Sequence, residues 1–501
     1  MLGAFSAFSL PPYNFFIINF LTFTLFFYFI FNKKSEKKNN FSFFKYGWYF
    51  GFGYFLFSLY WISIALTFDE DFTFLIPISL ILVPSFLAIF YGLVTYLFSI
   101  LYSKKIIVSF LIFSLIFGLI EFIRGIIFTG FPWNLIAFSF LDSKNFIQIL
   151  SITGTYSFNL ICISIFTSPA LILLRKSKKE VIVFSFFTVI SIIFLIFGNI
   201  KNNKFDLKKI NKHEYTVRSI SSNIKLERFY KVQDESKIIE ELIFLSKPQN
   251  NKKIIFIWPE GIITETYLDD VKIYKDLFSN SFSNNHLILL GVNSSKTINE
   301  NKLYYNSLGV FDNNLNLLGS YNKNKLVPFG EFIPFEKVLS KIGLKTITNN
   351  FQSFSKGEER KSINIKFSEF NFSFLPLICY EIIYSGQISG KQKFDYILNI
   401  SEDGWFGNSI GPEQHFAHSI FRSIESGNYI IRSANNGISA IINPLGGIVE
   451  KIESEKTGYI DFTESKSVEK TLFSMFGNKI FIFITLLYII LIFSFNKIKN
   501  E

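Results

Sequence analysis

Seven long apolar runs constrain this chain more than any other feature of its sequence. They cover residues 13–32, 46–67, 73–102, 106–128, 145–174, 180–199 and 478–496. Each run has roughly the 20 apolar residues that an α-helix needs to cross a bilayer. Residues 1–10 are apolar as well and could belong to an eighth span, but this stretch is too short to cross alone, so either the start of the sequence is late or we expect only a partial helix there. The sequence therefore predicts a multi-span helical membrane protein.

Charged and polar residues are concentrated between the sixth and the seventh run. We divide the chain into a transmembrane helical domain over 1–199, a globular catalytic domain over 200–475 and a C-terminal transmembrane helix over 478–496, with seven to eight spans in total. In the globular part, strands are expected to alternate with helices and then to follow one another closely. This pattern is typical of a layered α/β domain.

The basic residues of the loops predict how the chain is oriented. They lie in loops 33–38, 104–105 and 175–179, whereas loop 130–134 is uncharged. Because loops rich in lysine and arginine stay in the cytoplasm, we expect residues 200–477 on the opposite side of the membrane. The globular domain would then face a periplasm-like space.

The net charge of +11 does not indicate a nucleic-acid-binding protein. Much of this charge lies in the basic loops, where membrane topology explains it, and the chain has no basic-aromatic array. The sequence also has no metal-binding or nucleotide-binding motif, so we expect neither a metal nor another cofactor. We expect the chain to work as a monomer.

Three short islands of the globular domain carry residues suited to catalysis. They are Trp-Pro-Glu-Gly at 258–261, Tyr-Asn-Lys-Asn-Lys-Leu-Val-Pro-Phe-Gly-Glu at 321–331 and Leu-Ile-Cys-Tyr-Glu at 377–381. The chain has only two cysteines, of which Cys162 lies in an apolar run and is expected to pack there. Cys379 is the other, and a lone thiol in an exported domain is a candidate reactive group.

The residue types in these islands predict acyl transfer through a thioester. A cysteine attacks an ester as its thiolate, so a neighbouring group must take its proton. Glu260 directly follows an apolar strand and is a better candidate base than the histidines, none of which lies in a recognisable cysteine-protease signature. Lys323 would supply positive charge for the oxyanion formed when Cys379 attacks. The apolar helices suggest that the acyl group comes from a lipid.

At these islands the sequence resembles the nitrilase superfamily, whose fold is a four-layer αββα sandwich with a Glu-Lys-Cys site. The likeness is closer still to the apolipoprotein N-acyltransferase family of the bacterial inner membrane. The residues that carry it are 121–125, 129–133, 321–334, 378–381, 403–415 and 432–437. The resemblance spans essentially the whole chain.

The resemblance implies a role for each matching residue. Glu260 would be the general base, Lys323 the transition-state stabiliser and Cys379 the nucleophile. The following residues would support them or the substrates: Glu331, which would hold Lys323 or the incoming amine, Tyr380 and Glu381 beside the nucleophile, and Trp405, a lipid-facing aromatic on a mobile loop.

The chain departs from the family pattern at two positions in the globular domain. Tyr230 stands where the family often has tryptophan, a conservative aromatic exchange. Glu402 stands where asparagine is usual, and the extra carboxylate could alter the local field. We expect the site to tolerate Glu402 if its side chain points outward.

The family resemblance implies a reaction in two halves. An acyl chain would pass from a phospholipid to Cys379, and then to the α-amine of a diacylglyceryl-modified cysteine at the start of an apolipoprotein. A membrane-tethered amidase that hydrolyses a small amide is the alternative among enzymes. A transporter or scaffold whose outer domain only binds ligands is the alternative from another class, and the glutamate, lysine and cysteine argue against it.

Overall fold

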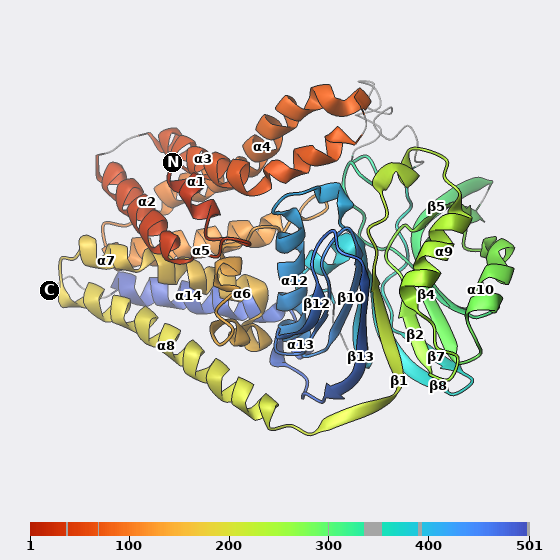
Figure 1. Cartoon of the computed structure of the whole chain (residues 1–501). Helices are drawn as coiled ribbons and strands as arrows, with labels where there is room; N and C mark the ends of the chain where they lie inside the picture. Colours follow the sequence, from red (N-terminus) through yellow and green to blue (C-terminus); the bar gives the residue numbers. More distant parts are fainter. Residues whose placement is uncertain (37–38, 69, 299, 335–352, 389–392, 498–501) are drawn as a thin grey trace.

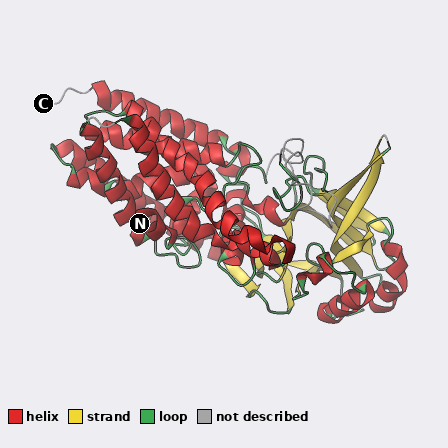
Figure 2. Ribbon diagram, turned by 90° about the horizontal axis from the view of Figure 1, so that it is seen from above, coloured by secondary structure: helices red, strands yellow, loops and turns green. Residues whose placement is uncertain are grey.

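The computed structural model describes residues 1–36, 39–68, 70–298, 300–334, 353–388 and 393–497. Helices form a bundle at one end of the molecule, and two β-sheets with their own helices lie at the other (Figures 1 and 2). The expected pairing of a multi-span helical domain with an α/β domain is confirmed.

Among the described residues, six helical segments are long and apolar enough to cross a membrane, judged by length and composition. They comprise α3 (Asn40–Leu59) with η1 (Tyr60–Thr67), η2 (Glu70–Leu75) with α4 (Ile76–Leu101), α5 (Ile106–Arg124), η4 (Phe146–Ile149) with α6 (Leu150–Thr167) and α7 (Pro169–Leu173), α8 (Lys178–Asp206), and α14 (Lys479–Lys497). Helices α5 and α6 are the most buried of these segments and form the centre of the bundle.

The first predicted span is a helix but is not one of the six. It corresponds to α2 (Ile17–Ser35), which buries Phe23 and Phe27 in the bundle core. Its last turns contain Asn32, Lys33 and Lys34, which lower its mean hydropathy. The stretch before it contains only the six-residue α1 (Leu2–Ala7), in agreement with the expected partial helix.

Helix α6 is broken where it meets the globular domain of residues 200–475, which is called the outer domain below. Gly154 has φ 68° and ψ 173°, a conformation that interrupts the helix and that glycine adopts without the steric cost of a Cβ. The next residue, Thr155, donates from both its backbone N–H and its hydroxyl to Glu425 Oε1, at 2.7 Å each. Glu425 belongs to α12 (Gly411–Ser426) of the outer domain and is paired with Arg422 at 2.8 Å. A carboxylate of the outer domain therefore caps the second half of a membrane helix.

The outer domain contains two mixed sheets. In the first sheet the strand order is β13 (Gly458–Lys466), β1 (Ile210–Ser221), β2 (Ile254–Ile257), β4 (His286–Ile298), β5 (Asn301–Asp312) and β6 (Leu317–Asn322), with β3 (Ile263–Tyr267) paired to β4. In the second the order is β12 (Ile448–Ile452), β11 (Ser439–Ile442), β10 (Ile430–Asn435), β9 (Tyr396–Glu402), β8 (Phe370–Ile378) and β7 (Ile363–Phe367).

The burial of β2 shows how the layers stack. All four of its side chains are buried, which requires both faces of the strand to be covered. Ile255 and Ile257 join the core between the two sheets, whereas Ile254 and Phe256 pack under α9 (Glu235–Ser246) and α10 (Lys275–Ser281). This alternation follows from the period of two in a strand. With α12 on the far side of the second sheet, the predicted four-layer αββα sandwich is confirmed.

Candidate active site

The three residues predicted to carry the chemistry lie just beyond the ends of three strands. Glu260 follows β2, Lys323 follows β6 and Cys379 follows β8. Lys323 Nζ lies 3.0 Å from Glu260 Oε1, and the charges of Glu260 and Lys323 both act on the Cys379 thiol. Two facing sheets therefore bring together residues that are more than 50 positions apart in the chain.

Glu260 is held by three hydrogen bonds and keeps one oxygen partly free. Its Oε1 accepts from Lys323 Nζ at 3.0 Å and from Asn306 Nδ2 at 2.7 Å. Its Oε2 accepts only one hydrogen bond in the described residues, from the backbone N–H of Glu402 at 2.9 Å. A carboxylate oxygen has room for a second donor. Glu260 Oε2 is therefore available to accept a proton.

Lys323 is buried between two carboxylates. Its Nζ lies 3.0 Å from Glu260 Oε1 and 2.9 Å from Glu331 Oε1, and its exposed fraction is 1%. Burial acts to lower the pKa of Lys323, but the charges of Glu260 and Glu331 outweigh burial and raise this pKa well above its usual range. The lysine therefore remains a cation, as a group that stabilises an oxyanion must. Asn306, which the sequence did not single out, also donates to Glu331, at 2.8 Å.

Cys379 occupies an unusual backbone conformation. Its φ is +48°, in the left-handed region that favours glycine, and it begins the 3₁₀ turn Cys379–Ile383 that follows β8. A residue other than glycine held there costs of order 1–3 kcal/mol and persists only when its surroundings enforce it. The carboxylate of Glu381 provides one such restraint, because it accepts from the backbone N–H of Ile378 at 2.9 Å.

The surroundings of Cys379 favour the neutral thiol. Burial raises the pKa of Cys379 well above its usual range, and the charge of Glu260 raises it further, while Lys323 acts in the opposite direction. The resting site therefore contains a thiol beside a carboxylate and not a preformed thiolate. Attack by this cysteine requires a base that takes the proton as the new bond forms.

This raised pKa predicts how the thiol responds to pH. Because thiolate is the reactive form, alkylation of Cys379 by iodoacetamide should be slow at pH 7. The alkylation rate should keep rising beyond pH of about 8.5, where an ordinary cysteine is half ionised. The measurement is the alkylation rate from pH 6 to 10, mapped to Cys379 by peptide mass. A rate that reached its plateau below pH 8 would contradict a raised pKa.

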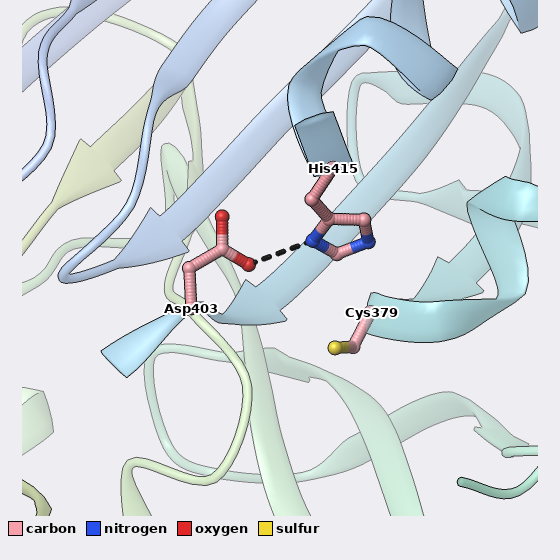
Figure 3. A group of neighbouring side chains, drawn as sticks. All are labelled: Cys379, Asp403 and His415. Atoms are coloured by element: carbon pink, nitrogen blue, oxygen red, sulfur yellow. Dashed lines mark hydrogen bonds and ion pairs between the residues drawn. The ribbon is translucent and has the colours of Figure 1, made fainter. Parts of the chain in front are cut away.

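Cys379 also belongs to a second group, which it forms with Asp403 and His415 (Figure 3). His415 Nδ1 lies 2.9 Å from Asp403 Oδ1, and Ser401 Oγ donates to the same oxygen at 2.7 Å. Burial acts to raise the pKa of Asp403, but Arg432 and His415 outweigh it and lower this pKa below its usual range. The closeness of His415 to Cys379 was missed from the sequence, although both Asp403 and His415 belong to the stretch 403–415.

The same three residues offer atom types that bind metal ions, within 4.8 Å of one another. Their environment argues against this use. Arg432 Nη2 lies 2.7 Å from Asp403 Oδ2 and 3.1 Å from His415 Nδ1. A buried guanidinium at this place repels a cation and already engages the carboxylate. The geometry therefore favours a polar network that braces the strand ends.

Two carboxylates expected to support the site are placed differently. Glu331 contacts Lys323 directly, as described above. Glu381 ties the nucleophile's turn to the loop that follows Lys323. Its carboxylate accepts from Tyr321 Oη (2.7 Å), Asn324 N (2.9 Å), Lys325 N (3.1 Å) and Ile378 N (2.9 Å), and pairs with Arg360 (3.0 Å). Arg360 had no sequence signal, because it comes from a segment without a recognised motif.

Tyr380 connects the nucleophile to the membrane bundle. Its hydroxyl donates to Gly130 O at 3.1 Å, and the hydroxyl of Tyr384 donates to Thr129 O at 3.0 Å. Both acceptors belong to the loop that follows α5. The residue next to Cys379 therefore faces the bundle and not the carboxylates of the site.

Trp405 and Tyr230 lie together at the edge of the site. The ring of Trp405 lies 6.0 Å from that of Tyr230, 5.2 Å from that of Phe229 and 6.2 Å from that of Phe68, measured between centroids. Phe68 belongs to the membrane domain, between η1 and η2. This aromatic cluster (Phe68, Phe229, Tyr230 and Trp405) therefore spans the two domains. The lipid-facing role that we expect for Trp405 stays a prediction.

Glu402 does not point outward. Its exposed fraction is 1%, and its carboxylate forms an ion pair with the buried Arg228. Burial raises the pKa of Glu402, although Arg228 acts to lower it. The condition that we set for tolerance of Glu402 is therefore not met, because both faces of β9 are covered and all seven of its side chains are buried.

Comparison with known proteins shows two matching family models. Residues 2–167 match the apolipoprotein N-acyltransferase N-terminal domain, and residues 227–465 match carbon-nitrogen hydrolase. The first match covers most of the helical bundle, and the second covers Glu260, Lys323 and Cys379.

Curated relatives match nearly the whole chain. An apolipoprotein N-acyltransferase of Rhizobium rhizogenes is 30% identical over 94% of this chain and 92% of its own length. An apolipoprotein N-acyltransferase of Rickettsia prowazekii is 33% identical over 89% of this chain and 88% of its own. Among solved structures, Nit3 of Saccharomyces cerevisiae, of the nitrilase superfamily, is 17% identical with a TM-score of 0.34, over 50% of this chain and 90% of its own.

Proposed function

Because the chain belongs to the apolipoprotein N-acyltransferase family, we propose that it moves a fatty acyl chain from a phospholipid to an apolipoprotein. The acceptor in this proposal is the α-amine of a diacylglyceryl-modified cysteine at the amino terminus of the apolipoprotein. The acyl chain would be held in between as a thioester on Cys379. The alternative of a membrane-tethered amidase is not favoured by these relatives.

One observation carries the proposal for the site. Glu260 and Lys323 are joined at 3.0 Å beside Cys379, and the residue after that cysteine bonds to the loop that follows α5. A nucleophile, a base and a fixed cation are the groups that thioester chemistry requires. Their place against the helical bundle suits a substrate that never leaves the lipid phase.

In the first half-reaction, Glu260 Oε2 takes the proton of the Cys379 thiol as the sulfur attacks the ester carbonyl of the phospholipid. The new C–S bond produces a tetrahedral oxyanion, and Lys323 stabilises its negative charge. When the oxyanion collapses, the C–O bond to the glycerol breaks. Glu260 returns its proton to that oxygen, and the lysophospholipid leaves.

In the second half-reaction, the α-amine of the acceptor attacks the thioester carbonyl. Glu260 takes a proton from the amine as the C–N bond forms, and Lys323 again faces the oxyanion. Collapse breaks the C–S bond, and the sulfur leaves as a thiolate that regains its proton from Glu260. The products are the N-acylated lipoprotein and the resting thiol. Two steps of moderate barrier replace one difficult transfer.

We also propose that the outer domain faces the periplasm of a bacterial inner membrane. The end of α14 and the start of α8 lie at the end of the bundle that is away from the sheets (Figure 1). Lys105, in a basic loop, donates to Asn496 O at 2.5 Å and so lies at that same end. The positive-inside rule supports a cytoplasmic position for it.

The direct test is the intact mass of the purified protein after incubation with phosphatidylethanolamine and no acceptor. We expect a gain of one fatty acyl group, mapped to Cys379 and removed by neutral hydroxylamine, which cleaves thioesters. No mass gain, together with hydrolysis of small amides, would contradict the proposal and favour the amidase.

A further inference from the structure

A buried ion pair lies behind the proposed base and outside the steps described above. Arg228 Nη2 contacts Glu402 Oε2, and the exposed fractions of the two side chains are 0% and 1%. Arg228 belongs to η5 (Leu226–Phe229), and Glu402 is the last residue of β9. Neither residue belongs to the Glu-Lys-Cys set, yet the Arg228 side chain bonds to the backbone of Gly261 and the backbone N–H of Glu402 bonds to Glu260 itself.

The arginine holds the chain on the carboxyl side of Glu260. Arg228 Nε donates to Gly261 O at 2.8 Å, and Gly261 has a φ of +59°. The remaining donors of Arg228 are also used, because Nη1 bonds to Ile224 O at 3.1 Å and to Lys225 O at 2.9 Å. The guanidinium therefore fixes the turn that orients Glu260.

The glutamate holds the carboxylate of Glu260. The backbone N–H of Glu402 donates to Glu260 Oε2 at 2.9 Å, which is the oxygen available to take the thiol proton. The side chain of Glu402 is itself fully engaged: Asn435 Nδ2 donates to Oε2 at 2.7 Å, and Gly404 N donates to Oε1 at 2.8 Å. These bonds restrain the side chain of Glu402, and the pairing of Glu402 with Asn435 of β10 restrains the backbone that carries the N–H.

We propose that Arg228 and Glu402 are a positioning pair that sets the orientation of Glu260 for proton transfer from Cys379. The proposal deepens the proposed function, since it rests on Glu260 as the base. Neither residue touches substrate in this view, and both act through the base. The pair also joins residues 226–230 to residues 402–406, which carry Phe229, Tyr230 and Trp405 of the aromatic cluster.

The chemistry of a buried pair makes the two residues depend on each other. Removal of one partner leaves the other as a buried charge without compensation, which is far more harmful than removal of both. An extra carboxylate at position 402 is therefore compatible with the site because position 228 supplies an arginine. The two positions should behave as one unit when they are changed.

The test is single-turnover acylation of the full chain in phosphatidylethanolamine vesicles without acceptor, followed by intact mass. The rate constant reports chemistry, and the plateau reports the fraction of folded enzyme. Glu402→Gln and Arg228→Met should each lower the rate constant by about 10²-fold, since small misplacements of catalytic groups have effects of this size. A lower plateau would report loss of folded enzyme and does not enter the rate constant, which is fitted separately. Glu402→Asp, which keeps the charge, should lower the rate less.

The double variant Arg228→Met with Glu402→Gln tests whether the two act together. Independent effects would multiply to about 10⁴-fold, whereas a single unit predicts a loss no larger than that of one variant. This comparison also holds if a single variant folds poorly, because the double variant has no buried unpaired charge. A multiplicative loss would overturn the proposal.

A matched control is available in the same domain. Arg218 and Asp461 form a two-bond pair between β1 and β13, at 2.7 Å for each bond, without contact to Glu260. Asp461→Asn should lower the midpoint of thermal unfolding and leave the acylation rate constant unchanged. If Glu402→Gln behaves like this control, with a lower midpoint and an unchanged rate, the pair is only structural and the proposal is wrong.

Alkylation of Cys379 by iodoacetamide separates this inference from the proposed function. If the wild-type enzyme forms no thioester, the proposed function fails, and the alkylation rate still tests the pair. A shift in its pH profile in Glu402→Gln, absent in Asp461→Asn, would show that the pair acts on the Glu260–Cys379 unit. Identical profiles in all three proteins would contradict the positioning role.

Discussion

Replacing Cys379 with alanine is expected to abolish acyl transfer while the protein still folds. In the proposed mechanism the sulfur of Cys379 carries the acyl group, and removal of such a nucleophile lowers rates by about 10⁴-fold or more. The variant should give no acyl adduct by intact mass and no N-acylated lipoprotein. Its unfolding midpoint should stay close to that of the wild type. Alanine is smaller than cysteine and has the same Cβ, so it fits the site and meets the same strain at a φ of +48°.

The matched control is the other cysteine. Cys162 is fully buried in α6, away from the Glu260, Lys323 and Cys379 set, so Cys162→Ala should leave acylation intact. Acyl transfer that survived in Cys379→Ala would contradict the thioester mechanism. It would also revive the interpretation of the outer domain as a ligand-binding module.

Replacing Glu260 with glutamine is expected to have opposite effects on two reactions of the same thiol. Acylation by phospholipid should fall by about 10²- to 10⁴-fold, because general base catalysis contributes that much. Alkylation of Cys379 by iodoacetamide should become faster at a given pH, since the charge of Glu260 helps to keep the pKa of that thiol high. The glutamine oxygen can still accept from Lys323 and Asn306.

A buried carboxylate remote from the site provides the control for this substitution. Asp312 is 5% exposed and accepts hydrogen bonds from Asn314 and Asn316 at the far end of β5. Asp312→Asn should change neither rate. Acylation that persisted in Glu260→Gln would assign the base to another group, and His415 is the titratable neighbour in a position to serve.

The residue types that the proposed thioester route requires could be recognised in the sequence. A thioester route needs a thiol, a base and a cation, and the three islands around Glu260, Lys323 and Cys379 supply those residue types. The positions of Glu260 and Cys379 at strand ends could also be predicted, because each of these residues follows a short apolar run of the length of a strand.

The residues that orient this set could not be predicted in the same way. Asn306 lies inside an alternating strand, where nothing separates a polar residue that faces the site from one that faces water. Glu402 is buried because both faces of β9 are covered, and the sequence of one strand does not show which strands have a layer on each face. The partner of Glu402, Arg228, is 174 residues away, a pairing that no local pattern can indicate.

The membrane domain shows the same limit at a different scale. Length and composition were enough to predict the apolar helices, because a bilayer imposes a minimum length on every span. The break at Gly154 could not be predicted, since glycine is common in membrane helices and most such glycines leave the helix intact.

The break in α6 has a consequence for how this protein is made. The N–H of Thr155 has its acceptor on Glu425, which is synthesised 270 residues later. During synthesis, five of the six long apolar segments, from α3 to α8, are made before any residue of α12 exists. The second half of α6 therefore lacks this acceptor, at the boundary between the bundle and the outer domain, until α12 has been made and has folded. Completion of the bundle is thereby coupled to folding of the outer domain, and a chain halted before α12 would leave the break in α6 without its carboxylate cap.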